Sequence, residues 1–252
     1  MAATPAPTTF PDLLASRLRH APGAPLVTYY DDATGERTEL SVTSYANWVA
    51  KHANLWVEEL DLEPEESTVL VDLPGHWLVP VLLGGAWAAG VAVTTDLATP
   101  YDVVVTEASG AATYADGEAT VVACSLHPFA LPSSDPLPPG VLDHGHLWPG
   151  QSDVHVPVLP VGPDTVAWRA AGVTVSQSEL LARAAGLGLP QGGRLLTTAH
   201  PAHEQGVPDL LAPLLTGSVV HVRHAAASTW DDRLRQERVD LVHGGPGQPP
   251  VL

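Results

Sequence analysis

Histidines are the residues of this sequence whose type and spacing come closest to a reactive site. The chain has 12 histidines among 252 residues, and His144, His146 and His155 lie within one short stretch. Imidazole is the commonest metal ligand in proteins, so these three could serve a metal-dependent hydrolase. Their spacing does not match His-Glu-x-x-His, which places two ligands and a general base on one helix face. We therefore predict loop or surface histidines, and we keep the metal site as the weaker alternative.

Other reactive groups are sparse. Pro201 lies between His200 and His203 and argues against a regular helix that would aim both rings at one ion. Cys124 is the single cysteine and ends an apolar run, which favours a buried, inert thiol. The sequence has neither the Gly-x-Ser-x-Gly of acyl hydrolases nor the Gly-x-x-x-x-Gly-Lys of phosphate-binding loops. No single motif therefore assigns a reaction.

The charge balance narrows the class of partner. The chain has 11 Lys and Arg against 28 Asp and Glu, a net charge of −17, and Lys51 is its one lysine. Such a chain is poorly suited to nucleic acid or to an anionic membrane surface. One cysteine and no basic-then-apolar leader predict a cytoplasmic protein. Residues 73–95 are uncharged and long enough to span a bilayer, but their Pro and Gly interruptions predict a buried helix and strand instead.

The hydrophobic pattern predicts an α/β fold. Residues 10–20 read as a helix, 25–30 and 36–40 as a hairpin, and helices and strands alternate from residue 43 onward. This alternation favours a mainly parallel sheet flanked by helices. Thr43, Ser176 and either Ser228 or Thr229 are predicted helix caps, with Glu179 completing a capping box after Ser176. We predict one domain over 1–252, with an irregular proline-rich segment at 125–163. The predicted helices are 43–60, 76–89, 176–187, 205–215 and 228–238; the predicted strands are 67–73, 103–106, 121–124, 165–168, 173–175, 192–198, 218–222 and 239–243, with one more starting at 91.

The order of these elements and several short phrases resemble the N-terminal large subdomain of adenylate-forming enzymes. This superfamily comprises acyl-CoA synthetases, luciferases and peptide-synthetase adenylation domains. The phrase Thr43-Ser44-Tyr45 opens a helix, Gly172-Val173-Thr174-Val175-Ser176 precedes another, and His203-Glu-Gln-Gly206 is followed by a leucine-rich helix. The resemblance implies that part of an acyl-side pocket lies at the matched positions. The candidate ligand pocket is Trp168, Arg169, Gly172, Ser176, His203 and Gly206.

The departures from the family matter more than the matches. The stretch 166–172 stands where the family has a Ser/Thr/Gly-rich loop that ends in Pro-Lys-Gly and wraps the ATP phosphates. Trp168 and two alanines replace the flexible residues, and Arg169 is the one nearby cation. The resemblance further implies an adenine-binding segment, a ribose-binding aspartate and a C-terminal domain with a catalytic lysine, none of which has a counterpart in this sequence. Because adenylation joins two anions and needs cationic stabilisation, we expect no catalysis, no cofactor and no surviving ATP or AMP binding.

The sequence is compatible with three functions. The first is a truncated, non-catalytic relative, a pseudoenzyme that acts as a binding or interaction protein. Its apolar face would be covered by a homodimer contact, by a protein partner or by the 125–163 segment. The second is a subunit of an acyl- or nucleotide-metabolising enzyme completed by another chain, and the third is the metal hydrolase. The Ala, Pro and Arg-over-Lys usage suggests a GC-rich, actinobacterial genome.

Overall fold

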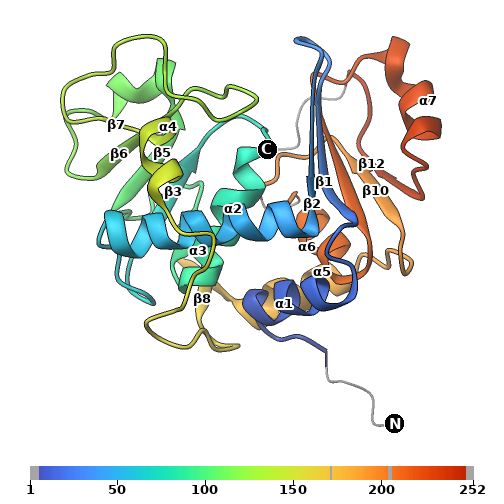
Figure 1. The fold of residues 1–252 in the computed structure, drawn as a ribbon, viewed down its shortest axis with the longest axis horizontal. Helices are drawn as coiled ribbons and strands as arrows, with labels where there is room; N and C mark the ends of the chain where they lie inside the picture. The colour runs from blue at the N-terminus through green and yellow to red at the C-terminus, as the bar shows by residue number, and fades with distance from the viewer. Residues whose placement is uncertain (1–5, 171, 204–205, 248–252) are drawn as a thin grey trace.

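Two β-sheets lie on either side of a group of helices (Figure 1). The computed structural model describes residues 6–170, 172–203 and 206–247. One continuous cluster of buried side chains joins both sheets to the intervening helices. The fold is α/β with mainly parallel strands, as the alternation predicts, but the order of elements does not reveal that the strands divide into two sheets.

The five-stranded sheet has the order β12-β10-β11-β1-β2. Strand β1 pairs in parallel with β11 and antiparallel with β2, so the predicted N-terminal hairpin forms one edge of this sheet. The helices α5, α6 and α7 alternate with β10, β11 and β12 along the chain. The elements are α1 (Phe10–His20), β1 (Pro25–Asp31), β2 (Glu36–Ser41), α5 (Gln177–Ala185), β10 (Arg194–Thr197), α6 (Gly206–Thr216), β11 (Ser218–Arg223), α7 (Ala227–Gln236) and β12 (Leu241–His243).

The seven-stranded sheet has the order β7-β6-β5-β3-β4-β8-β9. All of its neighbours are parallel except β8 and β9, which form an antiparallel hairpin at one edge. The elements are α2 (Val42–Asn54), β3 (Thr68–Asp72), α3 (Leu78–Ala89), β4 (Ala92–Thr94), β5 (Val103–Glu107), β6 (Thr120–Cys124), β7 (Leu142–Asp143), α4 (His144–Leu147), β8 (Val166–Ala170) and β9 (Val173–Ser176).

Helix boundaries agree with the predictions at some ends and correct them at others. Ser176 and Glu179 form the predicted capping box of α5. The cap of α2 is Ser41 rather than Thr43, because the Ser41 hydroxyl accepts from the Ser44 backbone N–H while Thr43 already lies inside the helix. Helix α7 begins after Ala226, whose methyl group cannot accept a hydrogen bond, so neither predicted cap is used. The predicted end of α2 near residue 60 is a π-helical turn over Leu55–Glu59.

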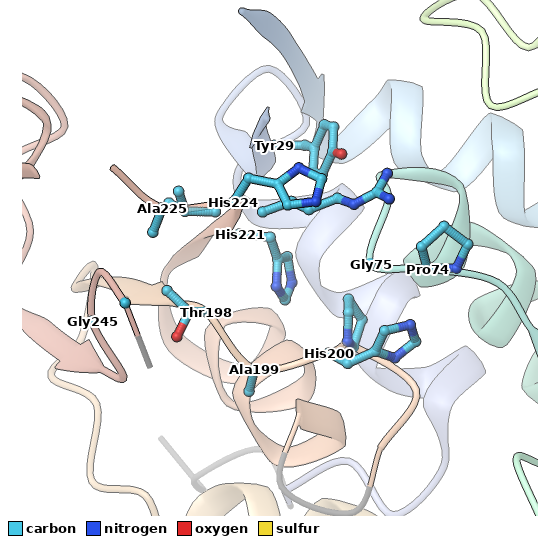
Figure 2. Close-up of a pocket in the computed structure, with 14 residues that line it drawn as sticks. Tyr29, Pro74, Gly75, Thr198, Ala199, His200, His221, His224, Ala225 and Gly245 are labelled. Atoms are coloured by element: carbon cyan, nitrogen blue, oxygen red, sulfur yellow. The ribbon is translucent and has the colours of Figure 1, made fainter. Parts of the chain in front are cut away.

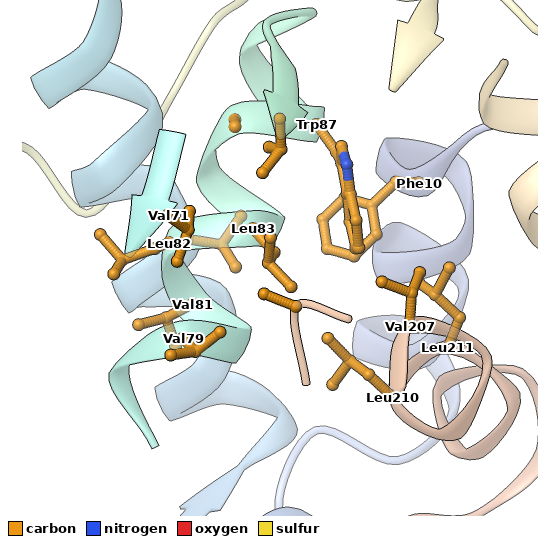
Figure 3. Close-up of a cluster of buried hydrophobic side chains, with 14 of the residues drawn as sticks. Phe10, Val71, Val79, Val81, Leu82, Leu83, Trp87, Val207, Leu210 and Leu211 are labelled. Atoms are coloured by element: carbon orange, nitrogen blue, oxygen red, sulfur yellow. The ribbon is translucent and has the colours of Figure 1, made fainter. Parts of the chain in front are cut away.

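Helix α3 is the centre of the core. It is buried on almost every side, which explains why its sequence is apolar throughout (Figure 3). Two glycines allow α2 to approach closely, because a Cβ on Gly84 would lie 2.7 Å from Val49 Cγ2 and one on Gly85 would lie 2.4 Å from His52 Cβ. In the described residues no helix is long and apolar enough to cross a membrane, and 73–95 contributes α3 and β4 instead.

A single buried glutamine ties three helices together. Gln177 is 2% exposed; its Oε1 accepts from the Phe10 backbone N–H at 2.8 Å, and its Nε2 donates to the Trp87 carbonyl at 2.9 Å. The Trp87 indole N–H in turn donates to the Ala167 carbonyl at 3.0 Å. One side chain thus satisfies buried backbone groups at the start of α1 and the end of α3 from the first turn of α5.

We expect Gln177→Ala to lower the free energy of unfolding by about 2–4 kcal/mol, because it leaves two buried backbone groups without their partner. Urea unfolding followed by circular dichroism measures this change. Gln236→Ala, on the exposed face of α7, is the matched control and should change stability by less than about 0.5 kcal/mol. Equal effects of the two substitutions would contradict the role given to Gln177.

Candidate functional site

A cavity of about 740 Å³ opens at the carboxyl ends of strands from both sheets. Its walls come from the residues that follow β3, β10, β11 and β12, together with Tyr29 of β1. Figure 2 shows Tyr29, His221 and His200 around this space, with Pro74 and Gly75 to one side. Ligands of open α/β sheets bind at the carboxyl ends of strands, and this volume suits a small organic molecule.

Two fully buried polar side chains face this cavity without a partner. Tyr29 is 1% exposed and His221 is 4% exposed. Tyr29 Oη and both ring nitrogens of His221 have no hydrogen-bond partner among the described residues. The two residues are register partners on the adjacent parallel strands β1 and β11, so their side chains lie beside each other on one face of the sheet. Buried polar groups are normally paired, so this pair marks a place where a ligand would supply the missing hydrogen bonds.

Positive charge reaches the same cavity from the end of β11. Arg223 lies next to the cavity, and its Nη1 is 3.7 Å from Asp31 Oδ2, longer than a close, hydrogen-bonded ion pair. Asp31 is buried and also accepts from the Ala33 backbone N–H and contacts His224 Nδ1 at 2.8 Å. Asp31 therefore positions the cationic wall of the cavity, and the same guanidinium lies close enough to the Tyr29 phenol to oppose part of the rise in its pKa that burial causes.

Burial fixes the charge state of the histidines at this site. Desolvation lowers the pKa of His221 to about 3 and that of His200 to about 4. The nearby His200 lowers the pKa of His221 further, and His203 lowers that of His200 further. His200 Nε2 lies 2.7 Å from the Leu73 carbonyl and its Nδ1 accepts from Ala202 N–H, which assigns the proton to Nε2. Burial also raises the pKa of Tyr29. Near neutral pH, His200 and His221 are thus neutral, and the cavity also offers the neutral phenol of Tyr29 and the guanidinium of Arg223.

The structure places two of the six predicted pocket residues close to this cavity. The His203 ring lies 4.2 Å from the His200 ring, and both line a smaller cavity beside Asp72. Gly206 begins α6, and a Cβ there would lie 1.8 Å from the His200 carbonyl oxygen, so glycine is required by the tight turn. The glycine of the family phrase therefore packs against the His200 backbone, and its histidine lies next to the His200 ring.

The other four predicted residues lie on and beside the β8–β9 hairpin. Trp168 is largely buried, and Arg169 Nη2 donates to the Glu65 carbonyl at 2.9 Å. Gly172 takes φ +76° at the turn, while Ser176 pairs with Val166 at the far end of the hairpin and caps α5. None of the four lines the cavity at Tyr29. The six residues are therefore not gathered around one pocket in the described part of the chain.

The histidines of the metal alternative have separate partners. His144 is buried, and its Nε2 lies 2.9 Å from His52 Nε2; His155 Nδ1 lies 2.6 Å from Asn54 Oδ1; His146 is exposed. Within residues 6–170, 172–203 and 206–247 no group of three His, Cys, Asp or Glu side chains could hold a metal ion. Cys124 is fully buried, as predicted, and burial raises the pKa of its thiol.

No family model matches the chain. A curated protein of Mycobacterium tuberculosis (strain ATCC 25618 / H37Rv), described as a TIGR03089 family protein, is 37% identical over 247 residues, which is 94% of this chain and 98% of that protein. The chain belongs to the TIGR03089 family. Its relation to that protein extends over almost the whole length of both, so the cavity lies within the shared region.

Solved structures show which fold this TIGR03089 family member has. A Brucella canis acyl-CoA synthetase matches with a TM-score of 0.76 and 18% identity over 96% of this chain. An acetoacetyl-CoA synthetase from Streptomyces lividans has a TM-score of 0.74 at 16% identity, and a benzoate CoA ligase from Burkholderia xenovorans 0.72 at 17%. The chain covers 48%, 42% and 50% of these three. The fold is thus that of the N-terminal subdomain of adenylate-forming enzymes, and the chain spans about half their length or less.

The residues that face the cavity escaped the sequence analysis for a definable reason. Tyr29 and His221 lie inside apolar strand segments, where a polar residue reads as an ordinary part of the sheet. One feature of the sequence could have located this site: His221 interrupts the valines of β11. A histidine buried in a central strand needs a hydrogen-bond partner, which a ligand can supply. The family phrases led instead to the hairpin at 166–176.

Neutral, buried histidines predict instability in acid. Because the pKa of His221 is about 3 in the folded chain and about 6.5 when unfolded, only the unfolded chain takes up that proton between these values. Protonation of His221 in the unfolded chain therefore lowers the free energy of unfolding progressively as the pH falls below about 6.5, and it has no effect above that value. We expect His221→Gln to flatten the dependence of unfolding free energy on pH by up to about 1.4 kcal/mol per pH unit between pH 4 and 6.

Urea unfolding at a series of pH values measures this slope. His20→Gln, on the exposed end of α1, is the control and should leave the slope nearly unchanged. A slope that is the same in the wild type and in His221→Gln would show that His221 does not enter the folded state as a buried neutral group.

Proposed function

We propose that this chain is a non-catalytic binding protein that holds a small organic acid in the cavity at Tyr29, His221 and Arg223. The observation that carries this proposal is the pair of fully buried, unpartnered polar side chains beside a guanidinium. A carboxylate accepts hydrogen bonds and carries the charge that a guanidinium binds best. The apolar residues of the cavity, which include Pro74, Val222 and Ala225, would contact the body of the acid.

The proposed ligand, a small carboxylic acid, is the kind of molecule that an acyl-side pocket of the superfamily would accept. In this chain we propose that the acid is bound but not adenylated. The matched solved structures are an acyl-CoA synthetase, a benzoate CoA ligase and an acetoacetyl-CoA synthetase. We extend the recognition of an acyl group to this chain as part of the proposal. In this chain the region of the phosphate loop is a hairpin in which Arg169 donates to the Glu65 backbone carbonyl. Gly172 is the one glycine of the hairpin, which lacks both the glycine-rich run and the lysine that would bind phosphates. Binding of an acid without activation is the function these features support best.

We expect carboxylic acids with short aliphatic or aromatic bodies to raise the melting temperature and to give saturable binding isotherms with the purified chain. The matching primary amides should bind at least about tenfold more weakly, because they lose the charge-assisted hydrogen bonds. Arg223→Met should weaken acid binding by a similar factor. Thermal shift followed by isothermal titration calorimetry makes both measurements.

The matched control is Arg235→Met, since Arg235 is an exposed arginine of α7 paired with Asp232 away from the cavity. It should bind the acids as the wild type does. If acids and amides bind alike, or if Arg223→Met binds acids as well as the wild type, the carboxylate is not the recognised group.

We expect no heat when ATP is titrated into the chain at millimolar concentration. The reason is that the phosphate loop is replaced and the chain carries a net charge of −17. A saturable ATP isotherm would contradict the proposal. It would favour the alternative in which the chain is a subunit of an acyl- or nucleotide-metabolising enzyme that another chain completes.

A further inference from the structure

The proline-rich segment carries a row of exposed aliphatic side chains on the outside of α2. Val154, Val156 and Val158 are 69%, 78% and 77% exposed, and Leu159 is 48% exposed. We call these four residues the aliphatic ridge. The chain descends from α4 across α2 before it reaches β8 (Figure 1). The ridge therefore lies on a different element from the cavity and shares no residue with it.

The backbone under the ridge is held in place by buried polar contacts. Asn54 of α2 is 2% exposed, and its Nδ2 donates to the carbonyls of Ser152 at 3.1 Å and Val154 at 3.0 Å. Its Oδ1 lies 2.6 Å from His155 Nδ1, and Lys51 Nζ lies 3.0 Å from Asp153. The segment is thus anchored through its carbonyls and one histidine, while the valines on either side of His155 stay in solvent.

This arrangement is unusual for a segment that only covers a helix. Exposed apolar side chains that gather in one place and are surrounded by polar residues are a mark of interaction sites. Valine also loses little rotamer freedom when it is buried by a partner. Because Asn54 already fixes the backbone, binding would carry a smaller entropic cost than ordering a free loop.

The surroundings of the ridge are strongly acidic. Gln151 contacts Glu59 at 3.5 Å, and Thr165 contacts Glu65 at 3.4 Å, so the segment runs alongside residues 58–66. Of the two cations nearby, Lys51 pairs with Asp153 and Arg169 donates to the Glu65 carbonyl. The exposed acids of this stretch are Glu58, Glu59, Asp61, Glu63, Glu65 and Glu66.

We propose that the aliphatic ridge is the docking site for a partner protein whose surface offers a shallow apolar groove bordered by Lys and Arg side chains. Charge complementarity selects this occupant, because a basic border would face the acids of 58–66. A second copy of this chain would bring two acidic borders together, and an anionic bilayer would be repelled in the same way. The ridge is small, which suits a transient complex rather than an obligate one.

Site-specific photo-crosslinking tests this assignment in the full-length chain. A benzophenone amino acid is placed at position 156 and, as the control, at position 173, because Val173 is 59% exposed on the edge strand β9. The chain is expressed in a mycobacterial host and irradiated in the cell. We expect a protein adduct at 156 and not at 173, with the crosslinked partner segment carrying a net positive charge.

The partner recovered in this way is then purified and titrated with unlabelled variants. Val156→Ser combined with Val158→Ser should weaken its binding at least about tenfold, while Val173→Ser should not, and added salt should weaken wild-type binding. Exposed substitutions of this kind leave folding intact, which circular dichroism checks. Adducts of the chain with itself, adducts with lipid or an acidic segment, equal adducts at 156 and 173, or the absence of any adduct would each overturn the proposal.

Discussion

The close approach of α2 and α3 is the contact on which the rest of the molecule depends. Gly84 and Gly85 leave room for Val49 and His52, so an entirely apolar α3 can be buried between the two sheets. From the end of this helix the Trp87 carbonyl reaches Gln177, and through it α1 and α5 are joined to the core. From the side of α2, His52 and Asn54 hold the proline-rich segment. One tight helix pair thus sets the spacing of the sheets and the course of the chain outside them.

The fixed spacing of the sheets explains how the cavity can exist. The carboxyl ends of β3, β10, β11 and β12 meet where the helices no longer fill the gap, and the loops after them line the space. Elsewhere in the interior, Gln177, Tyr45 and His52 are buried with partners on other elements. The buried Tyr29 and His221 without partners are therefore a local cost that the core can tolerate, as is typical of binding sites.

Sequence reasoning succeeded where the information is local. The hydrophobic pattern located α1, β1, α3 and β5 closely, because burial of one face imposes a period on the sequence. It could not divide the strands between two sheets, because pairs such as Thr28 with Val220 join residues far apart in the chain. Tyr29 and His221 meet through that same non-local pairing. Family phrases around 166–176 and at His203 do report the fold, and at Gly206 and Ser176 they coincide with a tight approach to the His200 backbone and a helix cap.

Electrostatics connects the proposed ligand with the rest of the surface. A chain of net charge −17 repels every anion at a distance, and the repulsion grows with the charge of the ligand. A carboxylate has one charge, which Arg223 can compensate inside a cavity where water is displaced. A nucleoside triphosphate has several charges and would meet Arg169, whose guanidinium is already directed to a backbone carbonyl. The same acidity would attract the proposed basic partner to the aliphatic ridge, so a single electrostatic field accounts for both proposals: weak nucleotide binding at the hairpin and a cationic protein surface on the outside of α2.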